Sequence, residues 1–119
     1  MGTSHLEGRR ELASAQSAYW QAWLPDGEVR GVVVLVHGFG EHSARYGHVG
    51  TRLAEAGFAV YASDHRGHGR TEGRRANIQR MALIVDDLGG FVWFAADRHP
   101  GLPVFMIGHS LGGLIALQY

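Results

Sequence analysis

The amino-acid sequence predicts a three-layer α/β fold with a mostly parallel sheet and right-handed crossovers. From residue 31 onward, short apolar runs alternate with segments of helical periodicity, in the order strand, helix, strand, helix, strand, helix. The 18 glycines among 119 residues gather where the predicted strands end and the backbone has to turn sharply. No internal repeat or linker interrupts this order, so residues 1–119 are interpreted as a single domain.

The composition argues against several classes of function. With 11 basic and 11 acidic residues, the chain carries no charge excess that would favour a nucleic-acid partner. The absence of cysteine excludes a disulfide framework and thiolate metal sites. No apolar run approaches the ~18 residues that cross a bilayer, and the N-terminus lacks the apolar core of a secretory signal. We therefore expect a cytoplasmic protein without a transmembrane segment.

The first part of the chain predicts two strands after a polar start. Residues 1–12 are polar and predict an irregular arm or a poor edge strand. Residues 17–24 place Tyr19 and Trp23 at even spacing among other strand formers, which indicates a strand. The continuous β-branched run 31–37 is typical of a central parallel strand that helices cover on both faces.

The remaining elements follow from periodicity and stop signals. Val49, Leu53 and Ala56 are spaced for one helix face, and Gly57 is a suitable helix stop. A buried strand is predicted at Phe58–Ser63. Further along, the sequence predicts a long helix from 78 to 98, a buried strand at 102–107 and a final apolar helix over 113–119.

The last predicted strand leads into a G-x-S-x-G pentapeptide that a helix follows, which is the context of a nucleophile elbow. Gly108 and Gly112 lack the Cβ that would collide with neighbouring backbone in so tight a turn. Ser110, at the apex, is the candidate nucleophile, with its hydroxyl exposed at the helix N-terminus. The alternative is a glycine-rich connection with a solvated serine.

Acyl transfer also needs donors for the oxyanion. One candidate is the backbone N–H of Leu111, the residue after the nucleophile. The other is the backbone N–H of Phe39, in the loop that follows the predicted central strand. Supporting positions are His37, whose expected role is structural, and His109, together with the glycines Gly38, Gly40, Gly108 and Gly112.

Three segments, 37–46 (HGFGEHSARY), 64–73 (DHRGHGRTEG) and 108–113 (GHSLGG), resemble the monoacylglycerol lipase and lysophospholipase branch of the α/β-hydrolases, among the serine aminopeptidase S33-like hydrolases. The resemblance covers roughly residues 17 to 119. It implies a serine hydrolase that cleaves carboxylic esters of monoglycerides, lysophospholipids or small acyl groups through an acyl-enzyme on Ser110. It implies no cofactor.

The chain departs from this family at the rest of the triad. In the family an Asp and then a His follow the nucleophile, whereas no acidic residue or histidine follows Ser110 here. The sequence is therefore interpreted as the N-terminal portion of an α/β-hydrolase fold, truncated after the elbow strand and its helix, with the acid and base outside it. Two alternatives stay open: another bond specificity, such as aminopeptidase or thioesterase, and an inactive fragment that binds apolar ligands or a partner.

Further expectations concern ligands and partners. The spacing of several histidines is compatible with zinc, but no H-E-x-x-H motif and no acidic third ligand accompany them, so we expect loop hydrogen bonding and no metal; these residues are His37, His42, His48, His65 and His68. Asp64, at a strand end, is expected to fix its loop by hydrogen bonding. A sheet that ends at the elbow strand exposes an apolar edge, which predicts self-association and poor solubility. Peripheral contact with a membrane is the other interaction expected of a lipid hydrolase.

Overall fold

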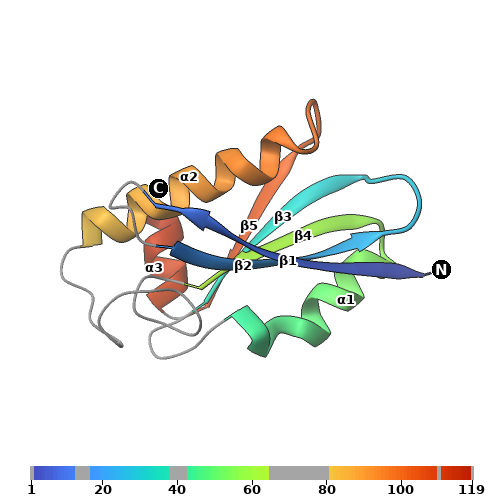
Figure 1. The fold of residues 1–119 in the computed structure, drawn as a ribbon, viewed down its shortest axis with the longest axis horizontal. Coiled ribbons are helices and arrows are strands. Elements are labelled where there is room, and N and C mark those ends of the chain that lie inside the picture. Colours follow the sequence, from blue (N-terminus) through green and yellow to red (C-terminus); the bar gives the residue numbers. More distant parts are fainter. Residues whose placement is uncertain (1, 13–16, 38–42, 65–80, 110, 119) are drawn as a thin grey trace.

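The computed structural model describes residues 2–12, 17–37, 43–64, 81–109 and 111–118. Within these ranges, five strands form one sheet in the order β1-β2-β4-β3-β5 (Figure 1). The strands are β1 (Thr3–Glu11), β2 (Ser17–Pro25), β3 (Gly31–Val36), β4 (Phe58–Ser63) and β5 (Val104–Gly108). The helices are a short 3-10 helix η1 (Ser43–Tyr46) and the α-helices α1 (Gly47–Glu55), α2 (Met81–Asp97) and α3 (Leu111–Gln118).

The predicted alternation of strands and helices after residue 31 is confirmed. β3 pairs in parallel with β4 on one side and with β5 on the other, which is the central place expected of its β-branched run. β2 joins β4 in antiparallel orientation, and β1 joins β2 in the same way. The sheet is therefore mixed, with a parallel α/β part and an antiparallel ribbon at one edge.

Side chains of β3 alternate between the two faces of the sheet and build two separate cores. Val32 and Val34 belong to a cluster that includes residues of α2, such as Phe91. Val33 and Leu35 belong to the opposite cluster, which α1 covers. Figure 1 shows α1 and α2 on opposite sides of the sheet. This arrangement is the predicted three-layer α/β architecture.

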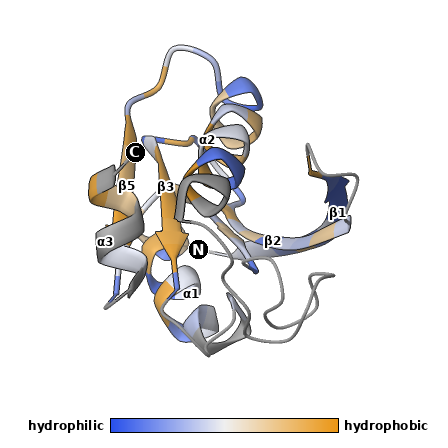
Figure 2. Cartoon of the chain, turned by 90° about the vertical axis from the view of Figure 1, so that its left-hand side faces the viewer, coloured by the Kyte–Doolittle hydropathy of each residue, from blue (hydrophilic) through white to orange (hydrophobic). Residues whose placement is uncertain are grey.

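The interpretation of residues 1–12 as an irregular arm is wrong, and the alternative of an edge strand is right. Thr3–Glu11 forms β1, which pairs with β2 along its 9 residues. Figure 2 shows that the C-terminal end of β1, drawn as the arrowhead, is hydrophilic. An antiparallel edge strand can face water on one side, so backbone pairing with β2 does not require an apolar sequence.

The last strand forms where the sequence predicts it, and the exposed apolar edge expected at this strand is confirmed, whereas the interpretation of its apolar run as buried is wrong. Side chains along β5 are exposed, with Phe105 at 51% and Ile107 at 47%. Figure 2 shows β3 and β5 as hydrophobic neighbours, yet β5 pairs with β3 alone among the described strands. A hydrophobic run predicts a strand, whereas its burial depends on which other elements lie beside it.

Helix α1 packs on the sheet with a slightly different face from the one predicted. Val49 and Leu53 pack against the core as predicted, whereas Ala56 is exposed. The buried positions of the helix are Gly50 and Ala54. Gly50 lies so close to the Trp23 ring of β2 that an added Cβ would come within 2.9 Å of its Cε2. Gly57 has a φ of +102°, so the predicted helix stop is confirmed.

Candidate active site

The turn between β5 and α3 docks against the carboxyl end of β3. The backbone N–H of His109 donates to the Val36 carbonyl over 3.2 Å. The N–H of Gly112 donates to the His109 carbonyl over 2.8 Å, which closes the turn. Ser110 itself lies outside the described residues, so its role as nucleophile stays a prediction.

Both glycines of the pentapeptide sit where a side chain does not fit. A Cβ on Gly108 would lie 2.6 Å from the Gly112 carbonyl oxygen. A Cβ on Gly112 would collide with the carbonyl oxygen of Val36 and lie 2.6 Å from that of His37. Gly113, the next residue, has room, because its nearest such contact is 3.5 Å. Strand β5, helix α3 and the end of β3 therefore approach one another closely at this turn.

Half of the other predicted site residues lie in the described part of the chain. His37 directly follows β3 and is buried, with 1% of its surface exposed. Leu111 is the first residue of α3, where the backbone N–H groups have no acceptor within the helix. His109 is exposed. Phe39, Gly38 and Gly40 lie outside the described residues, so the oxyanion donors stay predictions.

A buried hydrogen-bonded network lies where β2, β4 and η1 meet. The carboxylate of Asp64 accepts the Ser43 backbone N–H over 2.6 Å, and the Asp64 N–H donates to the Tyr19 carbonyl over 2.9 Å. The side-chain amide of Gln21 donates to Ser43 Oγ over 2.8 Å and meets His5 Nε2 over 2.9 Å. Asp64 therefore forms hydrogen bonds, but to η1 and β2; the loop that it is predicted to fix lies outside the described residues.

Sequence reasoning missed Gln21 and Ser43 as members of this network. The available signal was weak, because Gln21 is one polar residue between Tyr19 and Trp23 at the even spacing of a strand. A polar side chain at a buried strand position needs hydrogen-bond partners, but the sequence does not say which ones.

Two groups with shifted pKa values, Tyr61 and His99, lie beside the core that α2 covers. The hydroxyl of Tyr61 and Nε2 of His99 lie 2.8 Å apart in a hydrogen bond. Burial lowers the pKa of His99, and the nearby Arg98 lowers it further. Burial also raises the pKa of Tyr61. Both shifts favour the uncharged form of the group, so near neutral pH the pair contributes packing and a neutral hydrogen bond.

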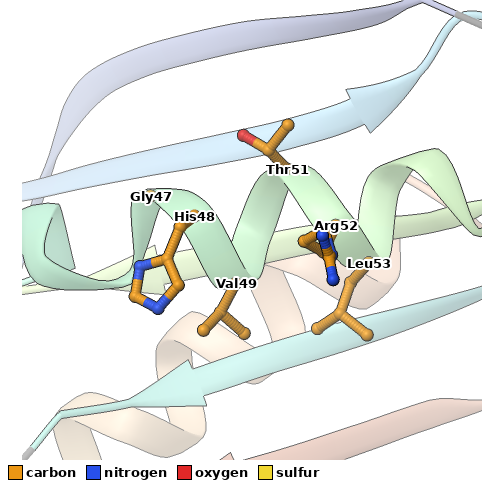
Figure 3. A pocket seen from close by; sticks show the side chains of 6 residues that line it. All are labelled: Gly47, His48, Val49, Thr51, Arg52 and Leu53. Carbon is orange, nitrogen blue, oxygen red and sulfur yellow. The ribbon is translucent and has the colours of Figure 1, made fainter.

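A cavity of about 720 Å³ lies along α1. Its described lining comes from α1 alone, with Val49 and Leu53 on one side of the helix and Thr51 pointing the other way (Figure 3). Gly108 and Gly112 do not contribute to it. The cavity therefore offers no support for the predicted nucleophile.

Neither a metal cluster nor a membrane span emerges from the described ranges. No group of three His, Asp or Glu side chains there could hold a metal ion. Of the histidines considered as zinc ligands, His37 is buried and His48 exposed, while His42, His65 and His68 lie outside these ranges. Among the helices described, none combines the length and apolar character that crossing a membrane requires.

Comparisons with known proteins place these observations in a family. Residues 27–119 match the family described as serine aminopeptidase, S33. Monoacylglycerol lipase of Mycolicibacterium smegmatis is 48% identical over 100 residues, which cover 84% of this chain and 36% of that protein. Human monoglyceride lipase is 38% identical over 105 residues, which cover 88% of this chain and 35% of that protein.

The structural comparison agrees with the sequence match. One similar solved structure is a soluble variant of monoglyceride lipase from Saccharomyces cerevisiae in complex with a substrate analog. The match has a TM-score of 0.87 and 30% sequence identity, and it covers 99% of this chain and 39% of the lipase chain. The chain thus spans about a third of the length of the curated relatives it matches. The fold, the glycine-dependent turn after β5 and the match over residues 27–119 together show that the chain belongs to the serine aminopeptidase S33 family and has an α/β-hydrolase fold.

Proposed function

We propose that the protein containing this chain is a serine hydrolase that cleaves carboxylic esters through an acyl-enzyme on Ser110. The observation that supports this most is the turn between β5 and α3. Gly108 and Gly112 leave no room for a Cβ, and the His109 N–H bonds to the end of β3. A connection this tight is what a nucleophile elbow requires, and a loose glycine-rich loop has no such requirement.

The proposed reaction follows from the groups assigned to it. Ser110 Oγ attacks the ester carbonyl carbon while a general base takes its proton. The backbone N–H groups of Phe39 and Leu111 donate to the oxyanion of the tetrahedral intermediate. The C–O bond to the alcohol then breaks, the alcohol leaves with the proton, and water hydrolyses the acyl-enzyme by the same steps. We propose that the acid and base lie outside these 119 residues, because no Asp, Glu or His follows Ser110 here.

Monoacylglycerols are the substrates that we propose first, followed by lysophospholipids and small acyl esters. The support is the similarity to proteins named monoacylglycerol lipase and monoglyceride lipase. A second candidate is the hydrolysis of an N-terminal peptide bond, which the description of the matching family favours. Parallel assays with a monoacylglycerol and an aminoacyl p-nitroanilide distinguish the two, because each proposal expects turnover of one substrate only.

The nucleophile is tested by intact mass after treatment with a fluorophosphonate. The expected result is a stoichiometric adduct on the protein containing this chain and none on its Ser110→Ala variant. The same measurement on the 119 residues alone asks whether they hold a base for Ser110, and here we expect no adduct. A folded full protein without an adduct would favour the alternative of a catalytically inactive module that only binds a ligand or partner.

Location and association stay predictions. We propose a cytoplasmic protein, which fractionation of cells expressing a tagged copy would test.

We also propose that the 119 residues self-associate through the exposed β5, whose side chains include Phe105 and Ile107. Peripheral contact with lipid is proposed for the whole protein as a consequence of its substrate, and co-sedimentation with phosphatidylcholine vesicles measures it.

A further inference from the structure

Strand β1 is an edge of the sheet and offers its backbone for further pairing. It pairs with β2 over residues 3–11, and no other described strand lies beside it. Along its open side, alternate residues direct an N–H and a C=O away from β2. An edge of 9 residues is long enough for another strand to add to the sheet through main-chain hydrogen bonds.

Basic and acidic side chains alternate on one face of β1. The ring of His5 contacts that of Trp23, with centroids 5.6 Å apart, so the odd-numbered residues of the strand lie on the face that α1 covers. Four exposed residues form this row, in the order basic, acidic, basic, acidic: His5, Glu7, Arg9 and Glu11. On the other face, the guanidinium of Arg10 lies 5.8 Å from the centroid of the Phe94 ring of α2. This cation is therefore turned away from the row.

The row complements itself when two copies of β1 pair in antiparallel orientation about a twofold axis. Residues that lie opposite each other in such a pair have their side chains on the same face of the sheet. A pairing centred on Gly8 sets basic against acidic residues along the whole row, with each contact formed twice by symmetry: Glu7 opposite Arg9 of the second copy, and His5 opposite Glu11 of the second copy.

A shift of this register by two residues in either direction brings like charges together. With the axis at Glu7, this carboxylate lies opposite its own copy, and with the axis at Arg9, the two guanidinium groups lie opposite each other. Like charges directly opposite each other destabilise a strand pair. With the axis at Gly8, the other face sets Leu6 opposite Arg10, so no like charges meet there. Charges on an edge strand usually discourage pairing, but the charges of β1 permit this one register.

Contacts with β2 hold the two central side chains of the row in place. The Tyr19 hydroxyl donates to Glu7 Oε2 over 3.0 Å, and Arg9 Nη1 donates to Ser17 Oγ over 3.2 Å. A carboxylate and a guanidinium can each take part in more than one hydrogen bond, so these contacts are compatible with a second partner. Side chains that are already ordered lose less entropy when a second copy binds.

We propose that β1 is a dimerisation strand, at which two copies of the protein containing this chain join their sheets in antiparallel orientation about a twofold axis at Gly8. The partner is a second copy of the chain, because the charge pattern of β1 is complementary to itself. The inference does not depend on the proposed ester hydrolysis, because none of the proposed catalytic groups lies in β1. It also concerns the edge of the sheet opposite to β5.

Charge reversals in the protein containing this chain test the register. Sedimentation equilibrium at low salt should show the wild type in equilibrium between monomer and dimer. Glu7→Arg sets a second guanidinium against Arg9, and Arg9→Glu sets a second carboxylate against Glu7. We expect either variant to raise the dissociation constant of the dimer about tenfold or more. Glu28→Arg is the matched control, because it makes the same charge change at an exposed residue outside β1, and we expect a change of less than about twofold.

A mixture of the two single variants separates charge pairing from a loss of folding. One copy then carries basic residues at both positions and the other carries acidic ones, so opposite charges meet again in each contact. We expect the mixture to form a heterodimer, and the double variant Glu7→Arg/Arg9→Glu to form a homodimer, both with about the dissociation constant of the wild type. A wild type that stays monomeric at the highest concentration measured would overturn the inference. A dimer that either single reversal leaves intact, or a mixture and a double variant that both stay monomeric, would overturn it as well.

Discussion

Gly112, in the first turn of α3, lies directly against the backbone carbonyl of Val36 at the end of β3. A Cβ at this position would collide with that oxygen and also lie 2.6 Å from the His37 carbonyl oxygen. The contact brings the helix after the predicted nucleophile onto the strand before the predicted oxyanion loop. The two halves of the candidate site are thus joined through backbone atoms.

Replacement of Gly112 by alanine is expected to destabilise the protein containing this chain. The clash involves backbone, which cannot rotate away, so we expect a loss of about 1–3 kcal/mol in the free energy of unfolding measured in urea. Gly113→Ala is the matched control, because its Cβ would meet its nearest atom at an ordinary 3.5 Å. Equal stability of the two variants would contradict the close approach.

Gly50 provides the same kind of test on the other face of the sheet. Gly50→Ala pushes a methyl group into the ring of Trp23, and we expect a loss of about 1–3 kcal/mol in thermal or urea unfolding. Gly47→Ala, on the same helix, has open space around its Cβ and is expected to be neutral or slightly stabilising. Trp23→Leu should reduce the effect of Gly50→Ala, and additive losses would count against this contact.

The hydrogen bond between Asp64 and Ser43 predicts that two substitutions of Asp64 reduce the stability of the protein by different amounts. Asp64→Ala leaves the buried Ser43 N–H without this acceptor, which costs about 1–3 kcal/mol. Asp64→Asn keeps an acceptor oxygen, so we expect a smaller loss. Hydrogen exchange at the Ser43 amide is the direct measurement: exchange should be fastest in Asp64→Ala, and unchanged protection in that variant would rule out the bond.

The lowered pKa of His99 predicts that stability depends on pH. His99 titrates near its ordinary value of 6.5 in the unfolded chain and lower in the folded protein, because burial and then Arg98 disfavour its charged form. Below pH 6.5 the unfolded state therefore binds more protons, and the free energy of unfolding falls as pH falls towards the folded pKa. Above pH 6.5 this pH dependence fades, because the histidine of the unfolded chain also loses its proton.

Urea unfolding at pH 7.5 and 5.5 measures this effect as a difference between variants. We expect His99→Gln to lose less stability than the wild type over this interval. Tyr61→Phe removes the hydrogen bond to His99 but keeps the ring that buries it, so its pH dependence should resemble that of the wild type. Identical pH profiles for wild type and His99→Gln would show that this histidine is not responsible.

The exposed β5 predicts association of the 119 residues when they are produced alone. Phe105 and Ile107 are both about half exposed on a strand that pairs with β3 only, among the strands described. Light scattering after size-exclusion chromatography should show mass increasing with concentration, and a lysine at either position should reduce this increase. A monodisperse monomer with a sharp, reversible thermal transition would contradict the prediction.

Much of the fold could be predicted because it depends on local patterns. The β-branched run of β3, the helical periodicity before Gly57 and the strand–glycine–helix order at Gly108 each express a preference of the chain itself. The positive φ of Gly57 and the collisions expected at Gly108 and Gly112 were also predictable, because the absence of a Cβ is a property of the residue.

Burial, strand pairing and hydrogen-bond partners depend on contacts between segments that are distant in the sequence, and local patterns do not predict these contacts. The apolar run of β5 predicted a buried strand, yet the burial of its side chains depends on which elements lie beside it, as the expectation of an exposed edge at this strand already recognised. The polar composition of residues 1–12 gave little sign of β1, because pairing with β2 uses backbone groups that every sequence has. The partners of Gln21 come from β1 and η1, far apart along the chain. The sequence alone determined the elements and the glycines of the turn; the tertiary structure decided burial and hydrogen-bond partners, because both arise only when distant segments meet.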